Sequence, residues 1–455
     1  MSTTARATRA QHDRTVDALR TTLRSVGSGQ VRLQKTTSNL FRPRSTPTGP
    51  TLDVRDLDHF IDIDTATGVL ETEGMITYED LVDVTLCQGF MPPVVLDFKT
   101  ITLGGAATGL GAESSSFRNG LPHSPIIEMD ILTGDGGLVT ATRDNEYSDL
   151  FYGFPHSYGS LGYSLRLKLQ LERVKPYVQL HHVRFGSADD WTAAMLRVFQ
   201  DKAFDGFAVD FMDGIYFKAD EIYLVLGTFV DEAPFVSDYT GQQIYYRSVR
   251  SRSVDYLTVR DYLWRYDTDM YWTSKVFGLE NPIIRGLWPR RARNTSVYRK
   301  LQMFDREYRF SDRLNMLRGK RFEWVLQDAD VPAEATGEFT DFLATEVGIT
   351  PMWLCPFRCD DELPLYPLDA GRAYVSIGFW WTVPLEGGQD SYYNNKLIED
   401  KITELGGLKP LYSTAHYSEE EFWNLFGGEE YHKLKSKYDP MGRFPNLYEK
   451  CVLSR

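Results

Sequence analysis

The chain has 455 residues, of which 42% are hydrophobic and 25% charged. This is the composition of a globular protein, and it excludes a disordered, collagenous or coiled-coil chain. At about 150 residues per domain, the length predicts two to three domains. The 50 basic and 63 acidic side chains give a net charge of -13, which argues against a nucleic-acid-binding protein. The 13% of aromatic residues either form core or line a large apolar pocket.

The number of cysteines and the polarity of the N-terminal segment indicate the cellular compartment in which the protein is expected. Four cysteines, Cys87, Cys355, Cys359 and Cys451, are too few for a disulfide scaffold. Cys355 and Cys359 have no nearby His or second Cys pair, so we expect buried thiols there rather than a zinc site. The N-terminal segment lacks the apolar stretch of a signal peptide, and no run of 18 apolar residues occurs. We therefore expect a cytoplasmic protein.

The N-terminal segment, residues 1–29, is predicted to contain one amphipathic helix over residues 1–26. Val16, Leu19, Leu23 and Val26 recur there at steps of three and four residues, and arginines surround them. Two interpretations stay open: the helix packs on the surface of a domain, or it makes a peripheral membrane contact.

Residues 30–175 are predicted to form an α+β domain with many short strands. Strands are expected over 60–64, 68–72 and 161–172, a helix over 77–89, and a hairpin from 126–133 and 137–142. A Gly/Ser-rich stretch, 100–120, separates the helix from the hairpin. Its bare backbone amides suit an anion such as a pyrophosphate. It lacks the third glycine of a Rossmann fingerprint and the Lys of a Walker loop, so a structural turn and a phosphate loop are equally supported.

Residues 176–400 are predicted to form a second domain, an antiparallel sheet flanked by helices. Strands are expected over 209–217, 221–229, 322–327 and 373–382, with a helix over 334–345. Within this domain, residues 241–300 hold ten Arg and two Lys against four Asp and one Glu, with Trp264, Trp272 and Trp288 among them. This segment is either a solvated face paired with acidic neighbours or a surface for anionic phospholipid. Residues 401–455 are predicted to be helical, with a break at Asp439-Pro440.

Several motifs in one order resemble a known family. They are Thr102-Leu-Gly-Gly, Gly109-x-Gly-x-Glu-Ser-Ser-Ser, Asp149-Leu-Phe-Tyr and Gly159-Ser-Leu-Gly162. Together they resemble the FAD-binding domain of the vanillyl-alcohol oxidase / p-cresol methylhydroxylase (PCMH) superfamily. Trp353-Leu-Cys-Pro-Phe, Glu420-Glu-Phe-Trp and Tyr431-His-Lys-Leu make the chain similar to the Δ24-sterol reductases from about residue 30 onward. The implied fold is α+β: a two-subdomain PCMH-type FAD-binding domain (30–175), a substrate cap (176–400) and a C-terminal helical segment (401–455) that closes on the flavin site.

The loop 35–42 and Thr77-Tyr-Glu-Asp-Leu look most like the actinobacterial flavin reductases of tuberculostearic acid (10-methylstearate) synthesis. That resemblance implies an FAD-dependent, NADPH-driven reductase that converts a 10-methylene-acyl phospholipid into its 10-methyl form. An S-adenosylmethionine-dependent fatty-acid methyltransferase would be its pathway partner, and peripheral contact with the inner face of the plasma membrane is an alternative to a purely cytoplasmic location. A flavin oxidase or dehydrogenase of an alcohol or sugar, a sterol side-chain reductase and a non-catalytic lipid-binding partner are the rival functions.

The resemblance also assigns site residues. Because the loop 35–42 has no His, FAD should be bound non-covalently, and no metal is expected. The implied FAD wall comprises Lys35, Thr37, Ser38, Asn39, Arg42, Thr102, Leu103, Gly104, Gly105, Gly109, Leu110, Gly111, Ala112, Ser115, Gly159, Leu161 and Gly162.

The expected chemistry begins with a proton, because an isolated alkene has no carbonyl to stabilise a carbanion. Protonation would give a tertiary cation that then accepts a hydride. Three residues, Glu113, Tyr412 and His416, are rival catalytic groups near the flavin. The substrate-binding aromatics Phe379, Trp380 and Trp381 would stabilise the cation by cation–π contact, or they are strand core.

Overall fold

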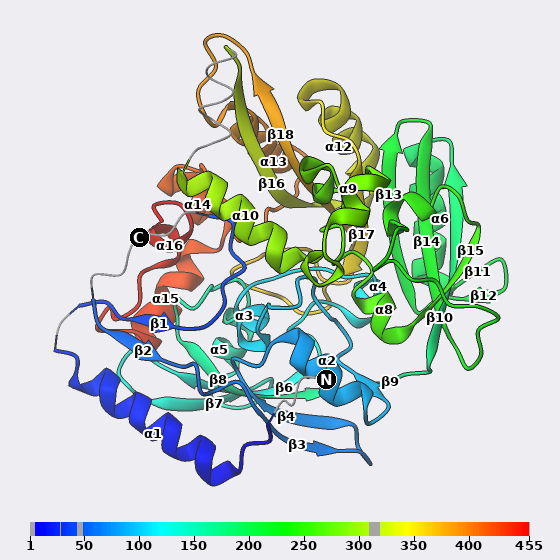
Figure 1. Ribbon diagram of the computed structural model, residues 1–455. Coiled ribbons are helices and arrows are strands. Elements are labelled where there is room, and N and C mark those ends of the chain that lie inside the picture. Colours follow the sequence, from blue (N-terminus) through cyan, green and yellow to red (C-terminus); the bar gives the residue numbers. More distant parts are fainter. Residues whose placement is uncertain (1–4, 28, 43–48, 309–318, 455) are drawn as a thin grey trace.

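The computed structural model describes residues 5–27, 29–42, 49–308 and 319–454. Figure 1 shows two large sheets, one in the lower part of the view and one in the upper right. The lower sheet has five antiparallel strands in the order β3–β4–β8–β6–β7. Their bounds are β3 (Phe60–Asp64), β4 (Val69–Glu73), β6 (Ile126–Leu132), β7 (Leu138–Thr142) and β8 (Tyr163–Gln170). The strands and hairpin predicted for this region are confirmed.

Short helices cover the lower sheet. They are α2 (Tyr78–Leu86), α3 (Leu103–Thr108) and α5 (Ser148–Gly153). A fourth short helix, α4 (Ser116–Asn119), instead packs its Phe117 into the core of the second sheet. Helix α2 begins where predicted, because the Thr77 hydroxyl accepts a hydrogen bond from the Asp80 amide. Two small paired sheets complete this part: β1 (Arg32–Gln34) with β2 (Thr51–Asp53), and β5 (Phe90–Met91) with β9 (Glu172–Arg173).

Helix α1 (Arg9–Ser25) packs beside the lower sheet (Figure 1). Thr8 and Gln11 form a capping box at its start. Val16, Leu19 and Leu23 are buried with Leu132 and Leu165 of the lower sheet. The packed-helix interpretation is therefore confirmed, and the apolar stripe of α1 is not available to a membrane.

The second sheet, the cap sheet, has seven antiparallel strands in the order β15–β10–β14–β13–β17–β18–β16. Their bounds are β10 (Tyr177–Phe185), β13 (Phe211–Lys218), β14 (Glu221–Val230), β15 (Val254–Thr258), β16 (Arg321–Pro332), β17 (Met352–Arg358) and β18 (Ala373–Leu385). Residues Trp191, Phe339 and Ile398 of α6 (Ala188–Asp201), α12 (Thr336–Phe342) and α13 (Tyr393–Glu404) share one core with it. The predicted antiparallel sheet flanked by helices is confirmed. A hairpin of β11 (Ala203–Phe204) and β12 (Phe207–Ala208) follows α6, and η3 (Ala333–Ala335) and η4 (Leu343–Val347) flank α12.

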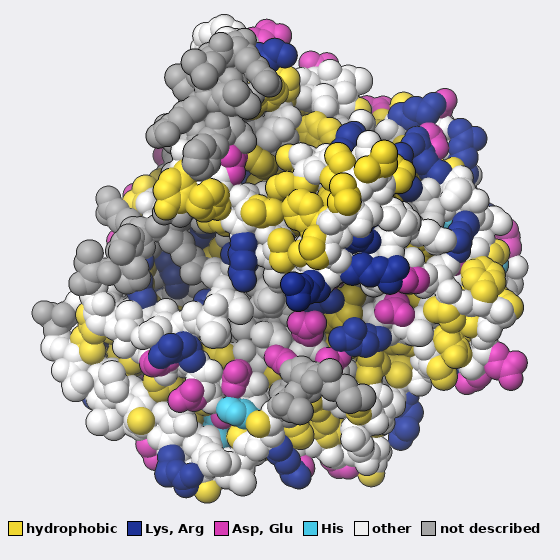
Figure 2. Space-filling model, viewed as in Figure 1, with side chains coloured by type: hydrophobic (Ala, Val, Ile, Leu, Met, Phe, Trp, Pro, Cys, Tyr) yellow, Lys and Arg dark blue, Asp and Glu magenta, His cyan; other side chains and the backbone are white. Residues whose placement is uncertain are grey.

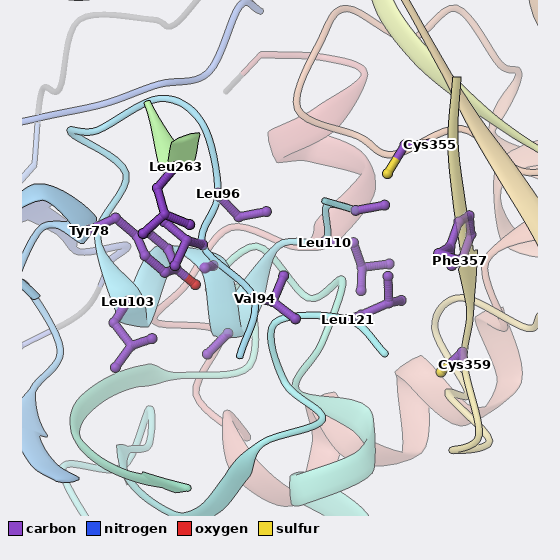
Figure 3. Close-up of a cluster of buried hydrophobic side chains, with 14 of the residues drawn as sticks. Tyr78, Val94, Leu96, Leu103, Leu110, Leu121, Leu263, Cys355, Phe357 and Cys359 are labelled. Carbon is purple, nitrogen blue, oxygen red and sulfur yellow. The ribbon is translucent and has the colours of Figure 1, made fainter. Parts of the chain in front are cut away.

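The largest core joins the two sheets. Figure 3 shows Leu110 and Leu121 of the lower part lying on the side that faces Cys355 and Phe357 of β17. All four cysteines are free thiols, and Cys355, Cys359 and Cys451 are buried. The cap therefore sits on the lower part through a continuous apolar interface.

The Arg-rich segment is not a simple solvated face, and its contact with phospholipid stays a prediction. It folds into α7 (Tyr245–Ser248), α8 (Val259–Leu263), η1 (Thr273–Phe277), α9 (Pro282–Leu287), η2 (Arg290–Ala292) and α10 (Thr295–Tyr308) beside β15. Trp264 and Trp272 are buried, and so are Arg265, Arg285 and Arg293. These three arginines therefore place positive charge in the interior of the fold rather than on its surface.

The C-terminal helices are α14 (Glu419–Leu425), α15 (Gly428–Tyr438) and α16 (Leu447–Cys451). The predicted break at Asp439-Pro440 is confirmed, because α15 ends at Tyr438. The predicted boundary at residue 400 falls inside α13. The segment packs on the lower part: the Gly134 amide donates to the Tyr438 carbonyl, and the Val31 amide donates to the Arg443 carbonyl. Among the described residues, no helix is long and apolar enough to cross a bilayer.

Candidate active site

An inner cavity lies where the two sheets meet. From the lower part it is lined by the loop 35–41, the segment 96–101 and the glycine-rich segment up to Glu113. From the cap, Tyr271, Asp328 of β16, Trp353 of β17 and Trp380 of β18 face it, and Tyr412 closes it. The cavity therefore depends on residues from across most of the chain.

The glycine-rich segment is both a packing device and a cavity wall. Thr102 caps α3 by accepting a hydrogen bond from the Gly105 amide. A Cβ at Gly104 would lie 2.7 Å from the Gly74 carbonyl oxygen and 2.7 Å from Ser164 Oγ, so only glycine lets α3 rest on the sheet. A Cβ at Gly111 would meet Leu96 at 2.9 Å. The segment is therefore a structural turn that also lines the cavity, and its role as a phosphate loop stays a prediction.

Most of the predicted FAD wall lines a cavity. Ten residues line the inner cavity: Lys35, Thr37, Ser38, Asn39, Thr102, Gly105, Gly109, Leu110, Gly111 and Ala112. Three more line an adjoining cavity: Arg42, Gly104 and Gly159.

Four members of the predicted wall lie elsewhere. Leu103 and Leu161 are buried in the core because their side chains point away from the cavities. The Ser115 hydroxyl donates to the Pro93 carbonyl. A Cβ at Gly162 would meet Ile131 Cγ2 at 2.6 Å, so this glycine serves the contact with β6. For these four residues the motif marks strand and helix packing rather than a cavity wall.

Two carboxyl groups meet at the base of the inner cavity. The Asp97 amide donates to Glu113 Oε1 over 2.9 Å, and both side chains line the cavity. Burial, together with the charge of Asp97, raises the pKa of Glu113 to about 8. Burial and the charge of Asp267 raise the pKa of Asp97 to about 7. At neutral pH, Glu113 therefore holds a proton that it can donate.

A buried ion pair lies close to these carboxyls. Arg265 Nη2 donates to Asp213 Oδ2 over 2.6 Å, and Trp353 Nε1 donates to the same oxygen over 3.0 Å. The Arg265 side chain is 3% exposed and that of Asp213 is fully buried. The guanidinium lowers the pKa of both Glu113 and Asp97, although burial outweighs it.

A second acidic group faces the cavity from the cap. Asp328 lies beside the Tyr412 hydroxyl, and burial, with the charge of Asp330, raises the pKa of Asp328 to about 8. Burial also raises the pKa of Tyr412. Tyr412 lines the inner cavity, as predicted for a catalytic group, and the structure adds Asp328 as its neighbour.

Only one of the three predicted substrate aromatics faces the cavity. Successive side chains of a strand point to opposite faces, so Trp380 lines the cavity while its neighbours on β18 do not. Phe379 is buried on the other face against Phe339, and Trp381 lies beneath Lys275. Tyr271 and Trp353 complete the aromatic wall, with the Tyr271 and Trp380 rings 4.4 Å apart.

His416 is not part of the cavity. Its amide donates to the Glu399 carboxylate, and its ring lies against Tyr392, which is half exposed. Residues 411–418 are not helical, so a spacing of four does not place His416 on the same side as Tyr412. Burial lowers the pKa of His416 to about 4, so the imidazole is neutral. The structure therefore does not bring His416 to the cavity beside Tyr412, where the sequence predicts it.

The adjoining cavity, here called the cationic cavity, is lined by four basic side chains. They are Arg32, Lys35, Arg42 and Lys450, and no carboxylate of the described residues lines it. Lys450 Nζ donates to the Tyr158 carbonyl over 2.8 Å. Burial, with the charge of Arg42, lowers the pKa of Lys450 to about 7. Such a concentration of positive charge favours a bound anion.

Comparisons with known proteins show which family model and which relatives this chain is similar to. Residues 14–142 match the family described as FAD binding domain. The chain is 24% identical over 440 residues to the Delta(24)-sterol reductase of Arabidopsis thaliana, covering 89% of this chain and 77% of that protein. It is 25% identical over 416 residues to the Delta(24)-sterol reductase of Homo sapiens, covering 88% and 77%. A stretch of 107 residues is 32% identical to Cytokinin dehydrogenase 6 of Oryza sativa subsp. japonica, covering 24% and 20%.

The domain match and the α+β fold define a protein with a PCMH-type FAD-binding domain, in the class of flavin-dependent oxidoreductases. Within that class, the chain is homologous over most of its length to Δ24-sterol reductases. The predicted fold class is confirmed.

Asp97 and Asp328 bring acidic groups to the inner cavity that the sequence patterns did not predict. Asp97 directly follows the buried run 94–96, and Asp328 lies within β16 between Gln327 and Ala329, both buried. A carboxyl group in an otherwise buried strand is a usable signal. The predicted strand ended at residue 327, one position too early to include Asp328.

Proposed function

We propose that the protein is an FAD-dependent, NADPH-driven reductase of an isolated C=C bond in a lipid, with a 10-methylene-acyl phospholipid as substrate and its 10-methyl form as product. The observation that carries the proposal is Glu113, a cavity-lining carboxyl whose pKa of about 8 keeps it protonated at neutral pH. Oxidation of an alcohol needs a base at this place, whereas reduction of an alkene needs an acid. Homology to Δ24-sterol reductases supports the same direction of reaction.

The residues fit non-covalent FAD. The bare backbone at Gly105, Gly109 and Gly111 allows close approach of a flat ring system. Asp97 Oδ1 is buried in the cavity wall and has no hydrogen-bond partner among the described residues. The four basic side chains of the cationic cavity would hold the pyrophosphate, which carries the matching charge.

Replacing Lys450 with Met should weaken FAD binding by about tenfold or more, because a charge-assisted hydrogen bond to phosphate is lost. Because the pKa of Lys450 is about 7, the affinity for FAD should depend on pH. Above pH 7 the free protein has a neutral Lys450, so the affinity of the wild type should fall as pH rises, and the variant should lose that part of the slope. Titration of apoprotein with FAD, followed by flavin fluorescence, measures both effects. Lys437→Met, which removes a half-exposed lysine of α15, is the control and should bind FAD normally.

When bound and reduced by NADPH, FAD supplies the hydride equivalent. The protein's own groups would do the rest. Glu113 would donate a proton to the terminal methylene carbon, leaving a tertiary cation at C10 and a carboxylate that the solvent reprotonates. Tyr271, Trp353 and Trp380 present aromatic faces that stabilise such a cation by roughly 0.5–2 kcal/mol each. The apolar walls exclude water, which would otherwise trap the cation as an alcohol.

The proposal is tested by an anaerobic assay with FAD, NADPH and 10-methylene-acyl phospholipid, read by mass spectrometry as the gain of two hydrogens. NADPH should bleach the flavin quickly, and the lipid should restore its colour. Bleaching by an alcohol or a sugar, with none by NADPH, would instead identify an oxidase or dehydrogenase.

A sterol side-chain reductase is the second candidate, favoured by the similarity to Δ24-sterol reductases. The same proton-first chemistry applies, because protonation of that alkene also gives a tertiary cation. Competition between a Δ24-sterol and the methylene lipid in one assay separates the two substrates.

For the proposed lipid substrate, an S-adenosylmethionine-dependent methyltransferase would supply the methylene group, and the reaction would occur in the cytoplasm or at the inner face of the plasma membrane.

A further inference from the structure

The outer surface of the cavity wall carries an unusual set of exposed apolar side chains. Val276 is 63% exposed, Ile283 73%, Ile284 41%, Leu287 81% and Phe304 52%. They come from η1, α9 and α10 and form what we call the apolar patch. Figure 2 shows hydrophobic side chains gathered over α9 and α10 on this face. A protein that stays in water rarely exposes large aliphatic groups together.

The patch is the outer face of a wall whose inner face lines the inner cavity. Behind it, Phe277 and Trp288 pack on a small core that includes Phe41, Phe98 and Tyr298. Phe41 and Phe98 line the inner cavity. One thin aromatic layer thus separates the proposed reaction site from the exposed aliphatic groups.

Basic side chains accompany the patch. Lys275, Arg290, Arg291 and Lys300 are exposed within the same stretch of chain, in a protein whose net charge is -13. The acidic residues of this stretch with described side chains, Glu280 and Asp305, are half-buried. Figure 2 shows Lys and Arg side chains along the lower border of the apolar surface. Aliphatic groups flanked by exposed cations match the layering of an anionic bilayer, with acyl chains beneath negatively charged headgroups.

We infer that the apolar patch, with Lys275, Arg290, Arg291 and Lys300, docks the protein on an anionic phospholipid bilayer and places the mouth of the inner cavity at the lipid surface. This assigns membrane contact to η1, α9 and α10, not to α1, whose apolar stripe is buried. The inference rests on the proposed function, since a lipid substrate explains why docking faces the cavity, but its test needs no turnover.

Co-sedimentation with vesicles tests the inference. The FAD-loaded wild type should pellet with vesicles of equal parts phosphatidylcholine and phosphatidylglycerol, and much less with phosphatidylcholine alone. Ile283→Asp/Leu287→Asp should lower the bound-to-free ratio at least tenfold, because two aliphatic anchors are lost. Arg291→Gln and Lys300→Gln should each lower it by about fivefold, and added salt should act in the same direction.

Matched variants elsewhere control for general effects of the substitutions. Met441→Asp changes a side chain that is 61% exposed in the C-terminal segment, and Arg197→Gln changes an exposed cation of α6. Both should sediment like the wild type. Unchanged thermal melting and an unchanged absorbance spectrum of the bound FAD would show that the patch variants are folded.

Two results would overturn the inference. One is equal vesicle binding by the wild type and the Asp double variant. The other is a wild-type dimer that the double variant converts to monomer while neither binds vesicles, which would make the patch an interface between copies of the chain. If vesicle binding behaves as expected but no lipid is reduced, docking stands and the proposed function fails.

Discussion

Glu113→Gln should lower the rate of alkene reduction by about 10²–10⁴-fold, the usual contribution of a positioned general acid. Reduction of the flavin by NADPH should be unaffected, because that step needs no proton from Glu113. Stopped-flow absorbance under anaerobic conditions measures the two half-reactions separately. A similar loss in both would show that the variant disturbs FAD binding and would contradict the assignment of Glu113 as proton donor.

The pKa of Glu113 also predicts in which direction the rate of alkene reduction changes with pH. A donor with a pKa of about 8 is fully protonated well below pH 8, so alkene reduction should be constant there and should fall as pH rises through 8. Asp97→Asn removes the neighbouring charge that raises the pKa of Glu113, so the decline should move to lower pH. His416→Gln is the matched control, because His416 lies outside the cavity, and it should leave the profile unchanged.

The raised pKa of Glu113 also makes the stability of the folded protein depend on pH. The folded protein holds the Glu113 proton up to about pH 8, whereas the unfolded chain releases it near 4.5. The stabilisation linked to this proton is therefore complete below 4.5 and is lost as pH rises toward 8. Glu113→Gln should remove this contribution, so its melting temperature should exceed that of the wild type at pH 9 by more than at pH 5.

Arg265→Leu should lower the free energy of unfolding by about 3–5 kcal/mol, because it leaves the Asp213 carboxylate buried without its partner. Denaturation in urea measures the loss. Arg260→Leu is the matched control: Arg260 bonds Asp83 in an ion pair that is 46% and 20% exposed, so its loss should cost no more than about 1 kcal/mol. Adding Asp213→Asn to Arg265→Leu should restore part of the stability. Equal losses in the two single variants would show that burial does not set the energy of the Arg265 pair.

Local patterns in the sequence were enough to predict the strands of the lower sheet and, in the cap sheet, β13, β14, β16 and β18. The hairpin of β6 and β7 and the pairing of β13 with β14 depend on neighbours in the chain, so alternation and turn residues locate them. The same holds for α2, whose Thr77 cap is a local interaction. The glycine-rich wall was also predictable, since Gly105, Gly109 and Gly111 line the cavity.

The sequence alone could not predict to which side of a strand a side chain points. Nor could it predict which residues far apart in the chain lie close together in the fold. Phe379 and Trp381 share a motif with Trp380 but point to the other side of β18, because the strand alternates. Asp328 comes close to Tyr412 only after 84 residues of chain have folded around it. The composition of the Arg-rich segment predicts a charged surface, but Arg285 forms a buried ion pair with Asp269. Composition alone does not distinguish a buried ion pair from exposed charges.

The walls of the cationic cavity come from segments that lie far apart in the chain. Its walls come from residues 32–42, 75, 102–108, 158–164 and 445–454. Lys450 reaches the Tyr158 carbonyl, and Cys451 lies 3.0 Å from Arg42 Nη1. A chain cut before α16 would lack the wall that Lys450 and its neighbours supply. Under the proposed function, we expect such a chain to bind FAD more weakly than the whole protein.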